Sequence, residues 1–244
     1  MTIRLHVDAD LAEGADVAVS PAQAHYLGSV MRLGPGDPVI LFNGRDGEWA
    51  ARLAEVNRKA ARLVVETRLR PQAPEPDVWL LFAPPKGPRL DFVTEKATEL
   101  GAALLRPVFT RRSVVTRVNE EKMRAHLIEA AEQCERLTVP VLAPPAPLDR
   151  ALAEWPSDRR LFVLAEHGPS RPLAEALTPG PAGFLVGPEG GFDKTELDAL
   201  AGLPFAVAVG LGPRILRAET AALAALACWQ ARHGDWAVGP AFRS

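Results

Sequence analysis

The chain has 244 residues and a formal net charge of −2; 48% of its residues are hydrophobic and 24% are charged. This composition suits one large globular domain or two ordinary ones, and it argues against a protein whose whole surface attracts nucleic acid, although a local basic patch would suffice for binding. The N-terminus carries acids where a signal peptide would be basic and then apolar, no apolar run reaches membrane-spanning length, and the two cysteines form no CxxC pair, so we expect a cytoplasmic protein with reduced thiols.

The first part of the chain predicts a small β-structure interrupted by one helix. Short runs of alternating hydrophobicity between turn residues predict strands. They cover residues 3–7, 16–20, 38–44, 48–56 and 61–69. The helix begins after Ser20, a good N-cap, with Pro21 at the first helical position. Several short strands with one helix favour a small β-barrel over residues 1–70.

A proline-rich stretch, residues 71–77, predicts a linker and a domain boundary. After it, strand-like and helix-like segments alternate to the end of the chain, which is typical of an α/β domain with a mostly parallel sheet. Continuous apolar runs predict buried strands at 78–85, 103–110, 160–166, 183–187 and 205–210. Helical periodicity predicts helices at 89–101, 119–137, 148–155, 172–177, 194–200 and 214–232.

Three of these strands end in loops that combine glycine with proline. The loops follow Leu164, Val186 and Val209. Glycine allows a close approach of the backbone, and proline stiffens the chain, so such loops suit a purine ring and a ribose bound beyond the carboxyl ends of the strands. The sequence holds no complete G-x-G-x-x-G fingerprint, P-loop, G-x-S-x-G elbow or metal-ligand spacing, so the familiar dinucleotide, phosphate, hydrolase and metal sites are disfavoured.

Two of the loops carry a family resemblance. "LVGPEGGF" (185–192) and "LGPRILRAETAAL" (211–223) resemble the signature pair of the SPOUT methyltransferases. The stretches 25–37, 92–114 and 129–140 narrow the resemblance to the bacterial family that methylates N3 of a uridine in 16S ribosomal RNA. The resemblance implies an N-terminal PUA-like β-barrel for RNA binding over residues 1–70 and a SPOUT methyltransferase domain with a deep trefoil knot over residues 78–244. It also implies S-adenosylmethionine as methyl donor, a homodimer, and 16S ribosomal RNA or the small ribosomal subunit as partner; from the spacing of His, Cys, Asp and Glu we expect no metal.

The residues that the resemblance assigns to the cofactor lie at the three strand ends. They are Leu164, Glu166, Gly187, Pro188, Glu189, Gly190, Gly191, Leu211, Gly212, Arg214, Ile215 and Leu216. The alternative is that the glycines only serve tight turns. Glu189 has two open interpretations, either close to the ribose hydroxyls or the sulfonium, or a solvated loop carboxylate.

Methylation of uridine N3 requires loss of the N3 proton, and the negative charge then spreads onto O2 and O4. A fixed arginine can stabilise that charge, and we assign this catalytic role to Arg217, with Arg214 holding a phosphate or the cofactor side. Glu219 is the second catalytic candidate, and its alternative is a favourable position in the first turn of a helix. No general base is identifiable, because the histidines nearest the loops, His167 and His233, have no visible supporting partner.

Basic side chains gather in two further stretches. Residues 106–117 contain four arginines and no acid, and Lys86 and Arg89 precede the first helix after the linker. Such charges bind phosphate, although a basic run is more often a solvated face. The residues expected to face RNA are His25, Arg32, Lys86, Arg89, Arg111 and Arg112. Two alternative functions stay open: a SPOUT methyltransferase that acts on another base or on tRNA, and a non-catalytic RNA-binding protein.

Overall fold

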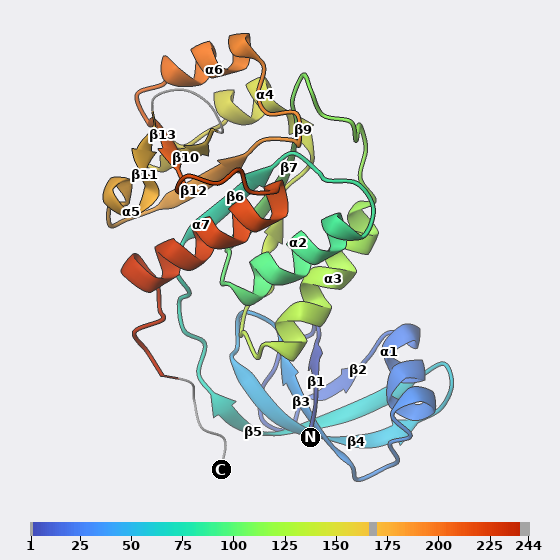
Figure 1. The fold of residues 1–244 in the computed structure, drawn as a ribbon. Helices are drawn as coiled ribbons and strands as arrows, with labels where there is room; N and C mark the ends of the chain where they lie inside the picture. The colour runs from blue at the N-terminus through green and yellow to red at the C-terminus, as the bar shows by residue number, and fades with distance from the viewer. Residues whose placement is uncertain (1, 166–169, 240–244) are drawn as a thin grey trace. The chain divides into compact units, whose positions relative to one another are not determined.

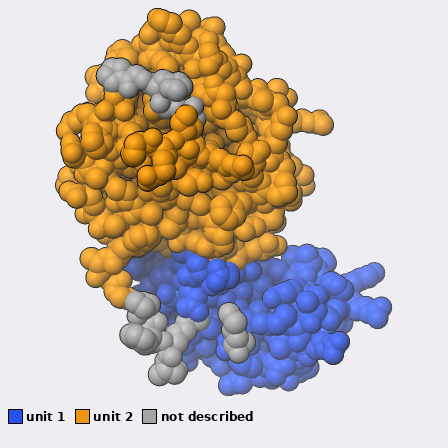
Figure 2. All heavy atoms as spheres, in the orientation of Figure 1, with its two compact units in different colours: residues 1–74, 131–139 blue, residues 75–130, 140–244 orange. Residues whose placement is uncertain are grey.

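The computed structural model describes residues 2–165 and 170–239. The chain forms two compact units, coloured separately in Figure 2. Unit 1 comprises Met1–Pro74 and Ala131–Val139, and unit 2 comprises Glu75–Ala130 and Pro140–Ser244. In the described part of the chain, no helix has the length and apolarity to cross a membrane.

Unit 1 is built on a five-stranded sheet with the order β1-β3-β4-β5-β2 (Figure 1). The strands are β1 (Ile3–His6), β2 (Asp16–Ala18), β3 (Pro38–Phe42), β4 (Glu48–Val56) and β5 (Ala61–Arg70). The predicted strands are therefore confirmed. Since the described strand order ends at β1 and β2, a closed barrel stays a prediction.

The helical segment of unit 1 starts where the sequence predicts. The hydroxyl of Ser20 accepts the backbone N–H of Gln23, whose side chain reaches back to the backbone of Ser20, so a capping box opens α1 (Pro21–His25). A π-helical turn, η1 (Tyr26–Val30), continues it. Leu27 is fully buried in the apolar core of the unit, so this segment covers the sheet.

A buried arginine binds the separate segment of unit 1 to its sheet. The guanidinium of Arg4 lies 3.7 Å from the ring centroid of Phe42 and donates to the carbonyl oxygen of Ala131 at 2.8 Å and to that of Arg136. The backbone N–H of His6 donates to Oε1 of Glu132 at 2.9 Å. A buried cation requires such acceptors, and these contacts explain why residues 131–139 belong to unit 1.

Unit 2 contains a parallel sheet with the order β11-β13-β10-β12-β6-β7-β8, and β9 pairs with β7. Its strands are β6 (Val78–Phe82), β7 (Leu104–Phe109), β8 (Val141–Leu142), β9 (Ala146–Pro147), β10 (Arg160–Leu164), β11 (Arg171–Pro172), β12 (Ala182–Val186) and β13 (Ala206–Gly210). Its helices are α2 (Pro88–Glu99), α3 (Glu120–Gln133), α4 (Leu148–Ala153), α5 (Leu173–Ala176), α6 (Lys194–Ala201) and α7 (Ala218–His233). The predicted α/β domain with a parallel sheet is confirmed.

The strand register of unit 2 creates two apolar faces. On one face Phe162, Phe184 and Leu80 are neighbours across three strands, with the two rings stacked at 5.5 Å between centroids. On the other face Leu185 and its neighbours belong to a core that includes Trp155 and residues of α4 and α6. The helix α7 packs against β12, β6 and α2, and Figure 1 shows α7 and α2 side by side.

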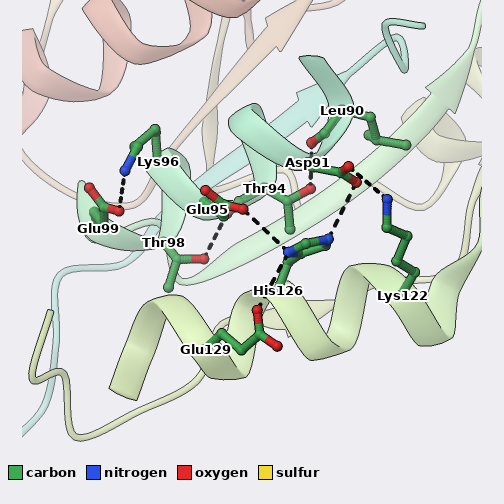
Figure 3. Close-up of polar contacts among 10 residues, drawn as sticks. All are labelled: Leu90, Asp91, Thr94, Glu95, Lys96, Thr98, Glu99, Lys122, His126 and Glu129. Atoms are coloured by element: carbon green, nitrogen blue, oxygen red, sulfur yellow. Dashed lines mark hydrogen bonds and ion pairs between the residues drawn. The ribbon is translucent and has the colours of Figure 1, made fainter. Parts of the chain in front are cut away.

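A polar cluster fixes α2 against α3 (Figure 3). The imidazole of His126 lies between two carboxylates of α2, with Nε2 3.4 Å from Asp91 and Nδ1 3.3 Å from Glu95. The ammonium of Lys122 lies 2.7 Å from Asp91, and Glu129 lies 3.8 Å from His126. Asp91 lies in the first turn of α2, so its contacts with Lys122 and His126 hold that turn against α3.

Candidate active site

A pocket lies at the carboxyl ends of three adjacent strands of unit 2, β10, β12 and β13. Its empty volume is about 850 Å³, open solvent at the mouth included. The loops meet here because the carboxyl ends of parallel neighbours share one edge of the sheet. The predicted cofactor residues that line it are Leu164, Gly187, Pro188, Gly191, Leu211, Gly212, Arg214, Ile215 and Leu216.

Two of the predicted cofactor residues that the structure describes do not line this pocket. Glu189 and Gly190 lie in the same turn as their pocket-lining neighbours but outside the lining. Glu166 and His167 fall outside the described residues. Sequence reasoning missed other lining residues, which include Ser170, Phe192, Ala218 and Ala221. Two of them could have been predicted from their position in the sequence, because Phe192 follows the glycine turn and Ala218 follows the last loop.

Gly187 and Gly191 serve different purposes in the turn after β12. The backbone N–H of Gly191 donates to the carbonyl oxygen of Pro188 at 2.8 Å, and Gly191 has φ +67°, which L side chains rarely adopt. At Gly187 the constraint is space, since an added β-carbon would lie 2.9 Å from the ring of Phe192. Gly187 therefore leaves room for the ring of Phe192, and Gly191 allows the backbone conformation of the turn.

The last loop stays non-helical farther than the sequence predicted. The predicted helix from Arg214 is wrong at its start: α7 begins at Ala218, and Arg217 is its N-cap with extended backbone (φ −65°, ψ 153°). Residues 211–216 instead form a wall of the pocket, with Gly212 at φ +96°. These residues have the side-chain pattern of a helix, but their packing around the pocket determines their backbone conformation instead.

The two predicted catalytic residues have different surroundings. Arg217 is exposed, and both of its chain neighbours, Leu216 and Ala218, line the pocket. Glu219 is buried, its Oε2 has no hydrogen-bond partner in the part of the chain that the structure describes, and it does not line the pocket. His233 ends α7, about 24 Å along the helix from its start at 1.5 Å per residue, so it is remote from this pocket.

The turn after β12 is held from outside the pocket by two of the arginines predicted to face RNA. Nη1 of Arg89 lies 3.2 Å from Oε1 of Glu189. Nη1 of Arg112 donates to the carbonyl oxygen of Gly190 at 3.0 Å, and Nη2 lies 3.8 Å from Asp193, the N-cap of α6. Both arginines therefore brace the loop that forms one wall of the pocket.

The segment after β7 is also bound to the start of α6. The backbone N–H of Arg111 donates to Oε1 of Glu196 at 2.8 Å, and Oε2 of Glu196 accepts the backbone N–H of Asp193 at 2.9 Å. Hydrogen bonds from the hydroxyl and backbone N–H of Thr195, with a smaller contribution from the nearby arginines, hold the pKa of Asp193 below its ordinary value. An ionised N-cap is favourable at the positive end of the helix dipole.

The other basic candidates divide by exposure. Lys86 and Arg111 are exposed in unit 2, and His25 and Arg32 are exposed at the helical segment of unit 1. By contrast, Arg106 is held by Glu154 at 2.6 Å, and its side chain is mostly buried. In the described residues, no group of three or more His, Cys, Asp or Glu side chains could hold a metal ion.

Comparison with known proteins gives two family matches. Residues 72–230 match a family described as an RNA methyltransferase domain, and residues 19–66 match an RNA methyltransferase PUA domain. The chain is 31% identical to ribosomal RNA small subunit methyltransferase E of Rickettsia conorii, over 92% of this chain and 93% of that protein. It is 32% identical to the protein of the same name from Synechocystis, over 93% of this chain and 77% of that protein.

Two solved structures are similar over nearly the whole chain. The ribosomal RNA small subunit methyltransferase E of Neisseria gonorrhoeae, bound to S-adenosylmethionine, has a TM-score of 0.87 at 29% identity and covers 97% of this chain and 100% of its own. A methyltransferase from Legionella pneumophila with bound S-adenosylmethionine has a TM-score of 0.85 at 31% identity and covers 96% of this chain and 99% of its own.

Proposed function

This chain belongs to the ribosomal RNA small subunit methyltransferase E family, and from that premise we propose that it methylates N3 of a specific uridine in 16S ribosomal RNA. It is an enzyme that uses S-adenosylmethionine to methylate ribosomal RNA. The observation that carries the proposal is the pocket at the ends of β10, β12 and β13, where the two signature loops meet.

The residues present fit the cofactor. Ligand pockets commonly have mostly apolar walls and a few polar groups, and this pocket has apolar walls from Leu164 and Phe192 beside the backbone of two glycine-containing loops. We assign Gly187, Pro188, Gly191 and residues 211–216 to cofactor binding. When bound, S-adenosylmethionine supplies an electrophilic methyl group.

The protein's part in the reaction is to position the uridine and stabilise its charge. The bound cofactor would supply its methyl group to N3 and leave as S-adenosylhomocysteine, with no covalent bond to the enzyme, so much of the rate enhancement would come from orientation of the uridine. Loss of the N3 proton spreads negative charge onto O2 and O4, and the guanidinium of Arg217, exposed between two pocket-lining residues, is suited to stabilise it. Arg214, which lines the pocket and is exposed, is assigned to a phosphate or to the cofactor side.

Three finer features of the fold belong to this proposal: a closed PUA-like barrel in unit 1, a deep trefoil knot around the pocket, and a homodimer. The family resemblance supports all three. Light scattering on the pure protein measures the mass in solution, and a mass of one chain would contradict the dimer. A crystal structure with bound cofactor would show directly whether the chain is knotted.

A methyl-transfer assay tests the substrate. Radiolabelled S-adenosylmethionine is supplied with naked 16S ribosomal RNA, with small subunits from a strain that lacks the gene, or with tRNA. We expect labelling of the RNA or the subunits, and a stop in primer extension at one uridine, because a methyl group on N3 blocks its pairing edge. Labelling of tRNA alone would contradict the proposal. Absence of cofactor binding by the folded protein in calorimetry would contradict any methyltransferase function.

A further inference from the structure

Glu189 is the charged residue of the turn after β12, and contact with the pocket does not explain why a carboxylate stands at this position. It lies outside the pocket lining, so its carboxylate does not belong to the cofactor wall. Its side chain is 40% exposed, and its Oε1 lies 3.2 Å from Nη1 of Arg89, whose side chain is 37% exposed. The carboxylate of Glu189 therefore forms an ion pair with Arg89 in the first turn of α2.

Arg89 is also one of the side chains expected to bind an RNA phosphate. A carboxylate and a phosphate present similar anionic oxygens to a guanidinium, and arginine binds both through paired N–H donors. Two anions that share one guanidinium also repel each other. Glu189 and a phosphate at Arg89 are therefore competitors.

We propose that Glu189 is an internal counter-ion that occupies the phosphate-binding position at Arg89 until the RNA backbone displaces it. This inference rests on the proposed function, since it requires RNA to bind next to the cofactor pocket. When a phosphate takes Arg89, the turn loses its contact with α2, while the hydrogen bond from Arg112 to the carbonyl oxygen of Gly190 remains. RNA binding thereby releases one of the two arginine contacts of the turn.

The exchange connects the RNA and cofactor sites. Glu189 lies in the turn between Pro188 and Gly191, and both of these residues line the pocket. If loss of the Arg89 contact changes the turn, then RNA alters the affinity for S-adenosylmethionine, and the cofactor alters the affinity for RNA by the same factor. The factor is small, because ion pairs between partly exposed side chains are weak.

Glu189→Gln is the decisive variant, because it keeps the shape of the side chain and removes the competing charge. We expect it to bind an in vitro transcript of 16S ribosomal RNA about twofold to fivefold more tightly than wild type at fixed ionic strength. In an Arg89→Gln background the same substitution should give no gain, which a double-mutant cycle measures. Asp158→Asn is the matched control: it removes an exposed carboxylate just before β10, at the opposite edge of the sheet from the pocket, and should leave RNA affinity unchanged.

A second measurement follows the cofactor. Calorimetry with S-adenosylmethionine, with and without the transcript, gives the factor by which RNA changes cofactor affinity, and we expect this factor to be closer to one in Glu189→Gln than in wild type. Unchanged RNA affinity in Glu189→Gln, or an equal gain in the Arg89→Gln background, would overturn the counter-ion role. A wild-type protein that binds neither cofactor nor RNA would overturn the proposed function itself.

Discussion

Gly187→Ala should destabilise unit 2 and weaken cofactor binding. The added β-carbon would lie 2.9 Å from Cε2 and 3.2 Å from Cδ2 and Cζ of Phe192. That ring is 7% exposed and belongs to the core formed with Trp155 and Leu185, so it has little room to withdraw. Such overpacking costs about 1–3 kcal/mol, which for a protein of this size lowers Tm by roughly 2–12 °C.

The effect on binding has a separate cause. Gly187 and Phe192 both line the pocket, so a displaced ring changes its wall. Gly190→Ala is the matched control in the same turn, because its β-carbon would meet nothing closer than 3.8 Å, and we expect a change in stability within about 0.5 kcal/mol. Scanning calorimetry and titration with S-adenosylmethionine measure both effects. Equal Tm values for the two variants would refute the steric argument.

Three further predictions concern catalysis, backbone conformation and pH. Arg217→Ala should keep cofactor affinity and lower kcat by about 10²–10³-fold in the methyl-transfer assay; lost cofactor affinity with normal turnover at saturation would instead assign Arg217 to binding. Gly212→Ala should cost about 1–3 kcal/mol in urea unfolding, although its β-carbon would enter open space, because Gly212 has φ +96°; a neutral effect would contradict the strain. Hydrogen bonds from the backbone N–H of Leu11 and the amide of Asn43 lower the pKa of Asp46 from its ordinary 3.8. The contribution of Asp46 to stability is therefore complete above that value and lost as pH falls through the lowered pKa. Asp46→Asn should remove this part of the acid sensitivity of unfolding, and an unchanged pH profile would exclude the role.

Most of the elements could be predicted because their signals are local. The run Val78–Phe82 is buried on both faces of a parallel sheet and reads as a continuous apolar stretch, and Ser20 with Pro21 specifies a helix start within one turn of chain. The strands β8, β9 and β11 have two residues each, too few to show a pattern. Their pairing depends on the longer strands beside them.

The pocket was predictable for a topological reason, and its details were not. Three neighbouring parallel strands bring their carboxyl ends to one edge, so glycine and proline after Leu164, Val186 and Val209 indicate one site. Periodicity could not show that the chain stays non-helical up to Arg217, since that depends on the wall that residues 211–216 form. Phe192 lines the pocket because the fold packs its ring beside Gly187, and periodicity does not show such a contact either.

The sequence shows where basic residues cluster but not which of them already have partners in the fold. The stretch 106–117 has no acid of its own, which suggested free cations, yet Arg106 is held by Glu154 and Arg112 by the carbonyl oxygen of Gly190, both distant in sequence. These contacts do not exclude a phosphate-binding role, because the Arg112 side chain is still 51% exposed. An arginine already held beside the cofactor turn loses less side-chain entropy when a phosphate arrives than a freely rotating one would. An arginine of this kind can therefore contact the turn in the free enzyme and also meet the backbone of bound RNA. The cost depends on its partners, which are the carbonyl oxygen of Gly190 and the carboxylate of Asp193 for Arg112, and the carboxylate of Glu189 for Arg89.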